Sequence, residues 1–197
     1  MSANYIQHMF GLDGKVATVI GGAGVLGGAL CRGLAQAGAH VVVADLTEEG
    51  CQTRVTELTE LGGAATACTV DVTQTESLEA SLAAAQAITG RVDILVNCAG
   101  VNYGSGVFDY PEEQWDRIMA INLKAVFVAC QVYGRHMVEA GGGAIVNISS
   151  IAGKMAWRRE IDPKGFDVTL GTSPILFGSK LLLACAMTDR DLSRIIA

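Results

Sequence analysis

Three glycines in the N-terminal part of the chain have the spacing of a turn that binds a nucleotide phosphate. Gly22, Gly24 and Gly27 follow an apolar run over residues 16–20 and precede a helix-like stretch. Glycine makes such a turn tight and lets the backbone approach a pyrophosphate, whose charge is held by amides at the start of the helix. The pattern predicts a dinucleotide-binding turn, and the alternative is an ordinary glycine-rich turn.

An acidic residue lies where such a site recognises the adenosine ribose. Asp45 ends the next apolar run, residues 41–44. A carboxylate at that place accepts hydrogen bonds from the ribose hydroxyls and repels a 2′-phosphate. The sequence therefore favours NAD as the cofactor. NADP is not excluded, because neighbouring loops can compensate for one charge.

Strand-like and helix-like segments alternate along the chain and would position these residues. The strand-like runs are near-continuously apolar, which is typical of a sheet that is covered on both faces. The alternation predicts an α/β fold, a doubly wound, Rossmann-like parallel sheet. The segments, in order, are 16–20, 28–37, 41–44, 48–61, 64–70, 78–89 and 94–96, followed by a fifth strand over 144–148. Thr47 and Thr73 precede helices as candidate N-caps.

A longer helical region is expected over residues 111–140. It starts with Pro-Glu-Glu, a favourable first turn, and carries a broad apolar surface. One interpretation is that the sheet covers one side and a second copy of the chain covers the other, which would make a homo-oligomer. The alternative is that this surface is buried entirely within one chain.

Composition narrows the class of protein. The chain has 197 residues, 50% of them hydrophobic, and only three prolines, which predicts one globular domain over residues 1–197. A net charge of −6 without a basic stripe argues against nucleic acid binding, and three dispersed histidines argue against a metal site. Six scattered cysteines favour a reducing, cytoplasmic setting, and no segment indicates secretion or a membrane span.

Several motifs together resemble the short-chain dehydrogenase/reductase family over about residues 10–153. The family's Thr-Gly-x-x-x-Gly-x-Gly turn corresponds to residues 20–27, with Ile20 in place of the threonine and the middle glycine displaced to Gly24. Asp71-Val72 matches the aspartate after the third strand, which implies an adenine contact; the alternative is a helix-capping aspartate. Residues 97–100 resemble Asn-Asn-Ala-Gly, with Cys98 as a departure. The resemblance implies cofactor binding by Gly21, Gly22, Gly24, Leu26, Gly27, Asp45, Asp71, Val72, Asn97, Ala99 and Gly100.

The same resemblance implies a partly retained catalytic group. Asn122 matches the catalytic asparagine, Ser150 matches the serine that orients a substrate carbonyl, with Ser149 as its alternative, and Lys180 matches the lysine of Tyr-x-x-x-Lys, unless it is a surface lysine. Leu176 stands in the tyrosine position, and no tyrosine follows Tyr133. Hydride transfer to a ketone leaves negative charge on oxygen, and leucine cannot supply the proton.

The function that the resemblance implies is reversible hydride transfer between a nicotinamide cofactor and a small-molecule alcohol or ketone. The glycine turn is similar to those of sugar and sugar-acid oxidoreductases. Two alternatives remain: a catalytically inactive nucleotide-binding or assembly protein, and a nonfunctional truncated product. Residues 154–197 are expected to form a divergent, frame-shifted or alternatively spliced tail. This part lacks the further strand, helix and strand that would complete a doubly wound sheet, so the domain is expected to be C-terminally incomplete.

Overall fold

The computed structural model describes residues 9–105, 107–149, 160–161 and 167–168. Five parallel strands form the central sheet in the order β3-β2-β1-β4-β5. Their bounds are β1 Val16–Ile20, β2 His40–Asp45, β3 Ala64–Thr69, β4 Ile94–Asn97 and β5 Ala144–Asn147. The strand order reverses between β1 and β4, which is the topological switch point of a doubly wound sheet. The predicted α/β fold is confirmed.

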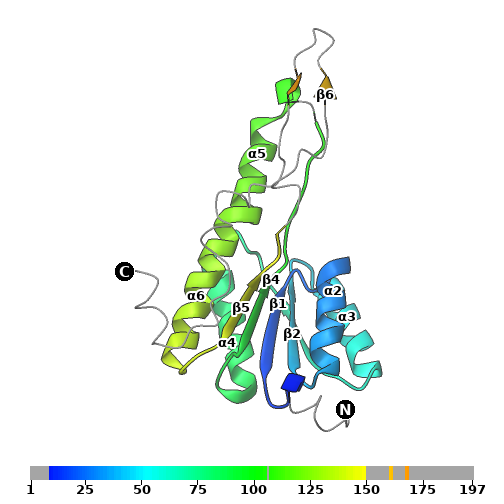
Figure 1. The fold of residues 1–197 in the computed structure, drawn as a ribbon, viewed down its shortest axis with the longest axis vertical. Coiled ribbons are helices and arrows are strands. Elements are labelled where there is room, and N and C mark those ends of the chain that lie inside the picture. The colour runs from blue at the N-terminus through cyan, green and yellow to red at the C-terminus, as the bar shows by residue number, and fades with distance from the viewer. Residues whose placement is uncertain (1–8, 106, 150–159, 162–166, 169–197) are drawn as a thin grey trace.

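Helices cover both faces of this sheet, as Figure 1 shows. The helices α2 (Val25–Gln36) and α3 (Glu48–Glu60) lie on one face. The helices α4 (Thr75–Thr89) and α6 (Ala125–Glu139) lie on the other. Both faces are therefore shielded from water, which explains why β1 is buried along its whole length and why its sequence shows no polar alternation.

The alternating side chains of the strands pack into two separate hydrophobic cores, one on each face of the sheet. Val19 and Val43 point toward α2 and α3, where they pack with Cys31 and Leu58. Ile20, Val42 and Leu95 point to the opposite face, where they pack with the fully buried Tyr133. Successive residues of a strand point to opposite faces, so the two cores divide the sequence of β1 and β2 between them.

The predicted helical region over residues 111–140 is nearly continuous but changes its winding in the middle. It comprises α5 (Glu112–Met119), the π-helical segment η2 (Ala120–Lys124) and α6. In Figure 1, α5 extends the line of α6 beyond the carboxyl edge of the sheet. One side of α6 packs on the sheet, whereas Trp115 and Phe127 are 50% and 45% exposed. The expected intramolecular burial accounts for one side only, and assembly through the other side stays a prediction.

The expected helix caps are partly wrong. Thr47 is the N-cap residue of α3 but makes no side-chain cap hydrogen bond. The helix α4 begins at Thr75 with Gln74 as its N-cap, not Thr73. Thr73 instead donates hydrogen bonds from its backbone N–H and its hydroxyl to the Asp71 carboxylate. A short polar side chain in a loop often satisfies a nearby turn rather than the following helix.

The remaining described elements lie outside the sheet. They are the short helix η1 (Val107–Asp109) and an antiparallel pair of two-residue strands, β6 (Glu160–Ile161) and β7 (Asp167–Val168). Ser150, Leu176 and Lys180 lie outside the described residues, as does most of the expected tail. Within the described part of the chain, no helix is long and apolar enough to cross a membrane, and no three side chains group as metal ligands.

Candidate nucleotide-binding site

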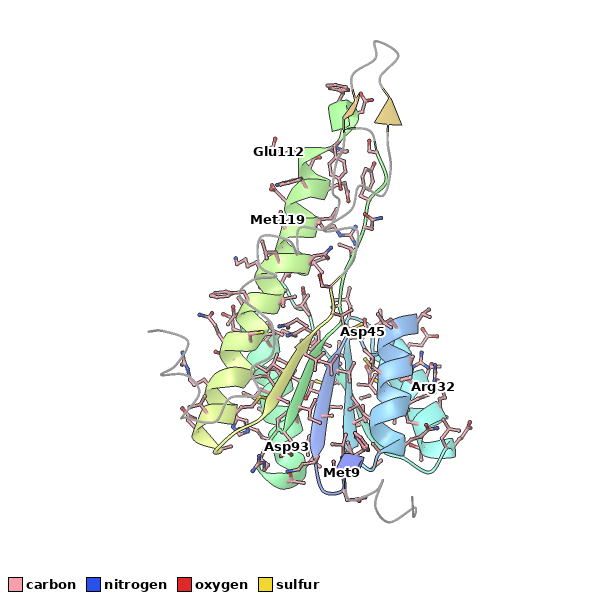
Figure 2. The ribbon with its side chains drawn as sticks, in the orientation of Figure 1. Met9, Arg32, Asp45, Asp93, Glu112 and Met119 are labelled. Carbon is pink, nitrogen blue, oxygen red and sulfur yellow. The ribbon has the colours of Figure 1, made fainter. Side chains whose placement is uncertain are left out.

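The carboxyl ends of β1, β2 and β4 meet at one edge of the sheet and border an open cleft of about 330 Å³. Figure 2 places Asp45 at this edge and Asp93 at the opposite edge. Ligands of doubly wound sheets bind in such a crevice, outside the carboxyl ends of the strands at the switch point. The lining residues are Ile20, Gly21, Gly24, Asp45, Leu46, Val70, Asp71, Val72, Thr73, Cys98, Ala99, Gly100, Val101, Arg117 and Ile121.

Two glycines of the turn are required by the space around them. Gly21 has φ of 86°, and a Cβ built on it would lie 2.5 Å from the backbone nitrogen of Ala99. A Cβ on Gly27 would collide with the carbonyl oxygen of Gly21. The turn after β1, the start of α2 and the loop after β4 therefore touch through their backbones, which leaves no room for side chains.

The other two glycines have different surroundings. Gly22 is buried behind the turn, where a Cβ would lie 2.9 Å from the carbonyl oxygen of Val19. Gly24 lines the cleft, and a Cβ on it would meet only the Gly21 carbonyl oxygen, at 3.3 Å. Gly24 thus keeps the cleft side of the turn clear of side-chain atoms.

The amino end of α2 is a ready anion-binding site. Its N-cap is Gly24, which has no side chain, and the first backbone bond of the helix runs from the Gly28 N–H to the Gly24 carbonyl at 2.8 Å. The first N–H groups of a helix, here those of Val25, Leu26 and Gly27, have no partner within the helix. A phosphate is a strong acceptor for such amides, and the helix dipole favours its charge.

Asp45 is held at the cleft by backbone amides. Its Oδ2 accepts from the Ala23 N–H at 3.1 Å, and its Oδ1 accepts from the Leu46 N–H at 2.8 Å. An ionised carboxylate has about four acceptor sites, so both oxygens can accept further hydrogen bonds from ribose hydroxyls. The carboxylate therefore connects the turn after β1 with the predicted ribose position.

Asp71 and Val72 also line the cleft, but the Asp71 carboxylate is already engaged. Its Oδ1 accepts from the Thr73 N–H at 2.9 Å and from the Thr73 hydroxyl at 2.7 Å. One carboxylate oxygen, Oδ1, therefore has a structural role in the turn, as the alternative interpretation of Asp71 expected. Asp71 lies in the cleft, and its contact with adenine stays a prediction.

Asn97 and Cys98 tie the cleft to the sheet. The Asn97 amide donates from Nδ2 to Asn147 Oδ1 at 2.7 Å, which joins the ends of β4 and β5. The Cys98 N–H donates to the Ile20 carbonyl at 2.9 Å and extends the pairing of β4 with β1. Sheet contacts at this point therefore persist although Cys98 replaces an asparagine of the motif.

The thiols near the cleft are held in their protonated form. Burial, together with the negative charge of Asp45, raises the pKa of Cys98. Burial raises the pKa of Cys31 to about 12, against the opposing effect of the Arg54 cation. The thiolate is the reactive form of cysteine, so these residues contribute packing and not nucleophilic chemistry.

Asn122 lies in the π-helical segment and is buried. Its Oδ1 accepts from the Val101 N–H at 2.9 Å, and its Nδ2 donates to the Val101 carbonyl at 2.8 Å. Single π turns occur frequently at functional sites. The side chain fixes the backbone of the loop after β4, next to Gly100. Asn122 therefore connects the π-helical segment to the loop that lines the cleft at Gly100 and Val101. The predicted positions of Ser150 and Lys180 relative to it stay untested.

Removing the Asn122 amide is expected to loosen this loop. Asn122→Ala leaves both backbone groups of Val101 without their partner, which should lower the free energy of unfolding by about 1–3 kcal/mol in urea denaturation. Asn102→Ala, on the same loop but at an exposed residue, is the control and should change the free energy by less than about 0.5 kcal/mol. Equal effects of the two substitutions would contradict the assigned role.

The functional residues that sequence reasoning missed fall into two groups. The first group lies at or just after strand ends, and its position in the predicted parallel sheet is the signal that could have identified it; its members are Ile20, Leu46, Val70, Thr73, Cys98 and Val101. Arg117 and Ile121 come from the helical region 111–124, and only the three-dimensional fold brings them to the cleft.

This fold and cleft define a nucleotide-binding protein of the doubly wound α/β class. The sequence profile of the short chain dehydrogenase family matches residues 15–161, and the chain belongs to this family. One relative is D-threitol dehydrogenase of Mycolicibacterium smegmatis, 42% identical over 151 residues, which cover 77% of this chain and 58% of that protein. The chain spans about three-fifths of the length of the curated relatives that it matches.

Solved structures of relatives contain both forms of the cofactor. A gluconate 5-dehydrogenase from Burkholderia cenocepacia in complex with NADP and tartrate is 30% identical, with a TM-score of 0.76, and the match covers 89% of this chain and 65% of that one. A 7α-hydroxysteroid dehydrogenase complexed with NADH and 7-oxo glycochenodeoxycholic acid is 33% identical, with a TM-score of 0.71, covering 84% and 62%. The family thus uses nicotinamide dinucleotides, and the choice between the two differs among its members.

Proposed function

We propose that this chain is an NAD(H)-dependent oxidoreductase that transfers hydride between nicotinamide and a secondary alcohol or ketone of the polyol or sugar-acid type. The observation that carries the proposal is the uncapped amino end of α2, which adjoins a cleft with Asp45 at its side. Amide donors bind the pyrophosphate, and the carboxylate binds the ribose and disfavours a 2′-phosphate. NAD is therefore the proposed cofactor.

The described residues fit such a cofactor because Gly24 keeps the cleft side of the turn clear of side-chain atoms. Bound nicotinamide would supply the hydride acceptor or donor. Asp71 and Val72 would line the adenine position, and Asn122 would hold the loop after β4. By family resemblance, Ser150 would orient the substrate carbonyl, and Lys180 would contact the cofactor ribose.

Proton transfer is the step of this mechanism for which the chain lacks the family's catalytic residue. Leu176 at the tyrosine position can neither donate nor accept a proton, so water would have to supply the proton in ketone reduction and accept it in alcohol oxidation. General acid catalysis contributes about 10²–10⁴-fold to a rate, so turnover by this chain is expected to be slow by that factor. The cofactor and the substrate would still bind, because the binding of each does not depend solely on the hydroxyl of the tyrosine that Leu176 replaces.

A substrate panel tests the proposal. The purified chain is incubated with NAD and each of D-threitol, glycerol and gluconate, and NADH is followed by its fluorescence. All three are chosen because relatives carry these substrates in their names. Slow NADH formation that Ser150→Ala suppresses would support the proposal. No reaction with any of the three polyhydroxy compounds, at saturating NAD, would count against it.

A second candidate is a nucleotide-binding protein without turnover. It is favoured by the lack of a tyrosine after Tyr133 and by the burial of Tyr133 itself, whose hydroxyl is hydrogen-bonded to Ser81 at 2.8 Å. Burial raises the pKa of Tyr133 to about 12, which makes it a poor proton donor to any substrate. Saturable NADH binding without turnover would favour this candidate, whereas broad thermal unfolding with strong binding of a hydrophobic dye would indicate a nonfunctional product.

The remaining partner assignments are also proposals. The exposed aromatic side chains Trp115 and Phe127 support a homo-oligomer formed through residues 111–140. Light scattering of the wild-type chain and of Phe127→Glu tests it, since a monomer in both would contradict the proposed assembly. Cys31 and Cys51 are free, buried thiols, which supports the proposal of a reducing, cytoplasmic setting.

A further inference from the structure

An arginine from α3 reaches the back of the glycine turn. Arg54 donates from its Nη2 to the Ala23 carbonyl at 3.3 Å and to the Gly24 carbonyl at 3.5 Å. Its side chain is only 16% exposed although it carries a full charge. A largely buried charge needs hydrogen-bond partners, and two partners of Arg54 are the carbonyls of the turn.

The two carbonyls determine where the amides of the turn point. In a trans peptide the C=O and the following N–H point in opposite directions. The Ala23 carbonyl shares its peptide with the Gly24 N–H, which points away from Arg54 and donates to the Gly21 carbonyl at 3.2 Å. Asp45 holds the preceding peptide through the Ala23 N–H. The contact with the Gly24 carbonyl likewise turns the Val25 N–H, the first amide of α2, away from Arg54.

Neighbouring groups hold the guanidinium in this place. Glu57 accepts from Arg54 Nη1 and, through its other oxygen, from Arg32 Nη1 at 2.7 Å. On the opposite side, a Cβ on Gly28 would lie 2.6 Å from Arg54 Nε. Glycine is less favourable than alanine within a helix, and the packing of Arg54 across α2 explains why Gly28 is a glycine.

The charge of Arg54 favours an anion at the turn. A cation near the amino end of a helix opposes the helix dipole, so its position there is unfavourable in the free protein. A phosphate at the α2 amides would reverse that effect, because it is attracted both by the amides and by the guanidinium behind them. The arrangement is therefore better suited to the phosphate-bound state than to the free state.

We propose that Arg54 is a positioning residue for the cofactor pyrophosphate, acting through the carbonyls of Ala23 and Gly24. This inference rests on the proposed nucleotide-binding function and deepens it. Arg54 lies on α3, outside the glycine motif, and is not among the residues that line the cleft. Its predicted effect on binding depends on the phosphates of the ligand and not on the adenosine.

Arg32 provides a matched control. Arg32→Gln removes the same charge from the same carboxylate, Glu57, without touching the turn. Binding of NADH, ADP and adenosine is measured by calorimetry for the wild type, Arg54→Gln and Arg32→Gln. Loss of charge-assisted hydrogen bonds predicts that Arg54→Gln weakens NADH and ADP about tenfold and adenosine less than about twofold. Arg32→Gln should change all three by less than about twofold.

A second variant covers the case in which Arg54→Gln does not fold. Gly28→Ala keeps the arginine but pushes the guanidinium from the carbonyls, and alanine favours the helix. It should retain the melting temperature yet weaken ADP binding several-fold, and amide hydrogen exchange of residues 23–25 should accelerate in the ligand-free protein. A merely structural role of Arg54 would not separate stability from binding in this way.

The outcomes separate this inference from the proposed function. If the wild type binds neither NADH nor ADP, both the proposed function and the proposed role of Arg54 are overturned. If the wild type binds NADH, but Arg54→Gln and Arg32→Gln weaken it equally, only the role of Arg54 is overturned. The same holds if adenosine binding falls as much as ADP binding, or if Gly28→Ala leaves ADP binding and turn exchange unchanged.

Discussion

Replacing Gly27 with alanine is expected to abolish NADH binding and to lower the free energy of unfolding by about 3 kcal/mol. The added methyl group would collide with the Gly21 carbonyl oxygen and crowd the backbone of Gly22. None of these atoms is the end of a flexible side chain, so the turn and the first turn of α2 must separate. Urea denaturation and NADH fluorescence measure the two effects.

Gly33 on the same helix is the control for this substitution. A Cβ there would meet nothing within 4 Å, and the residue is exposed. Gly33→Ala should therefore leave NADH affinity unchanged and raise the free energy of unfolding by up to about 1 kcal/mol. Normal NADH binding by Gly27→Ala would show that the contact between the turn and α2 does not shape the site.

Neutralising Asp45 is expected to change cofactor preference. Asp45→Asn keeps an oxygen for the Ala23 N–H but removes the charge that faces a 2′-phosphate. The ratio of the NADPH dissociation constant to that for NADH should fall at least about tenfold, which corresponds to about 1.4 kcal/mol of lost repulsion. Competition titrations with the two reduced cofactors give this ratio directly.

Asp71→Asn is the matched control, because this second carboxylate of the cleft is engaged with Thr73 and lies at the predicted adenine position. It should leave the ratio unchanged within about twofold, since its charge is not directed at the ribose. An equal shift in both variants would mean that general charge in the cleft, and not Asp45, sets the preference.

Much of the fold could be predicted from local patterns. The buried strands were recognisable because both faces of the sheet are covered, so that runs such as residues 41–44 are wholly apolar. The glycine turn was recognisable because its spacing has a steric cause, and the structure finds that cause at Gly21 and Gly27. Asp45 followed from its place at the end of the second strand.

Other features depended on contacts that sequence spacing does not encode. The π-helical segment that places Asn122 against Val101 has no local sequence signal. Arg54 is separated from the Ala23 carbonyl by 31 residues, and only the packing of α3 beside α2 brings them together. Threonine is a common N-cap residue, which is why Thr73 was expected to cap α4. Its hydrogen bonds go instead to Asp71, two residues before it in the chain.

Titration of the wild-type chain with NADH and, separately, with NADPH is the most direct test of the nucleotide site. Nicotinamide fluorescence follows both. The proposed role of Asp45 and of the uncapped amino end of α2 predicts saturable NADH binding and weaker NADPH binding. Absence of binding by either cofactor, or tighter binding of NADPH, would contradict it.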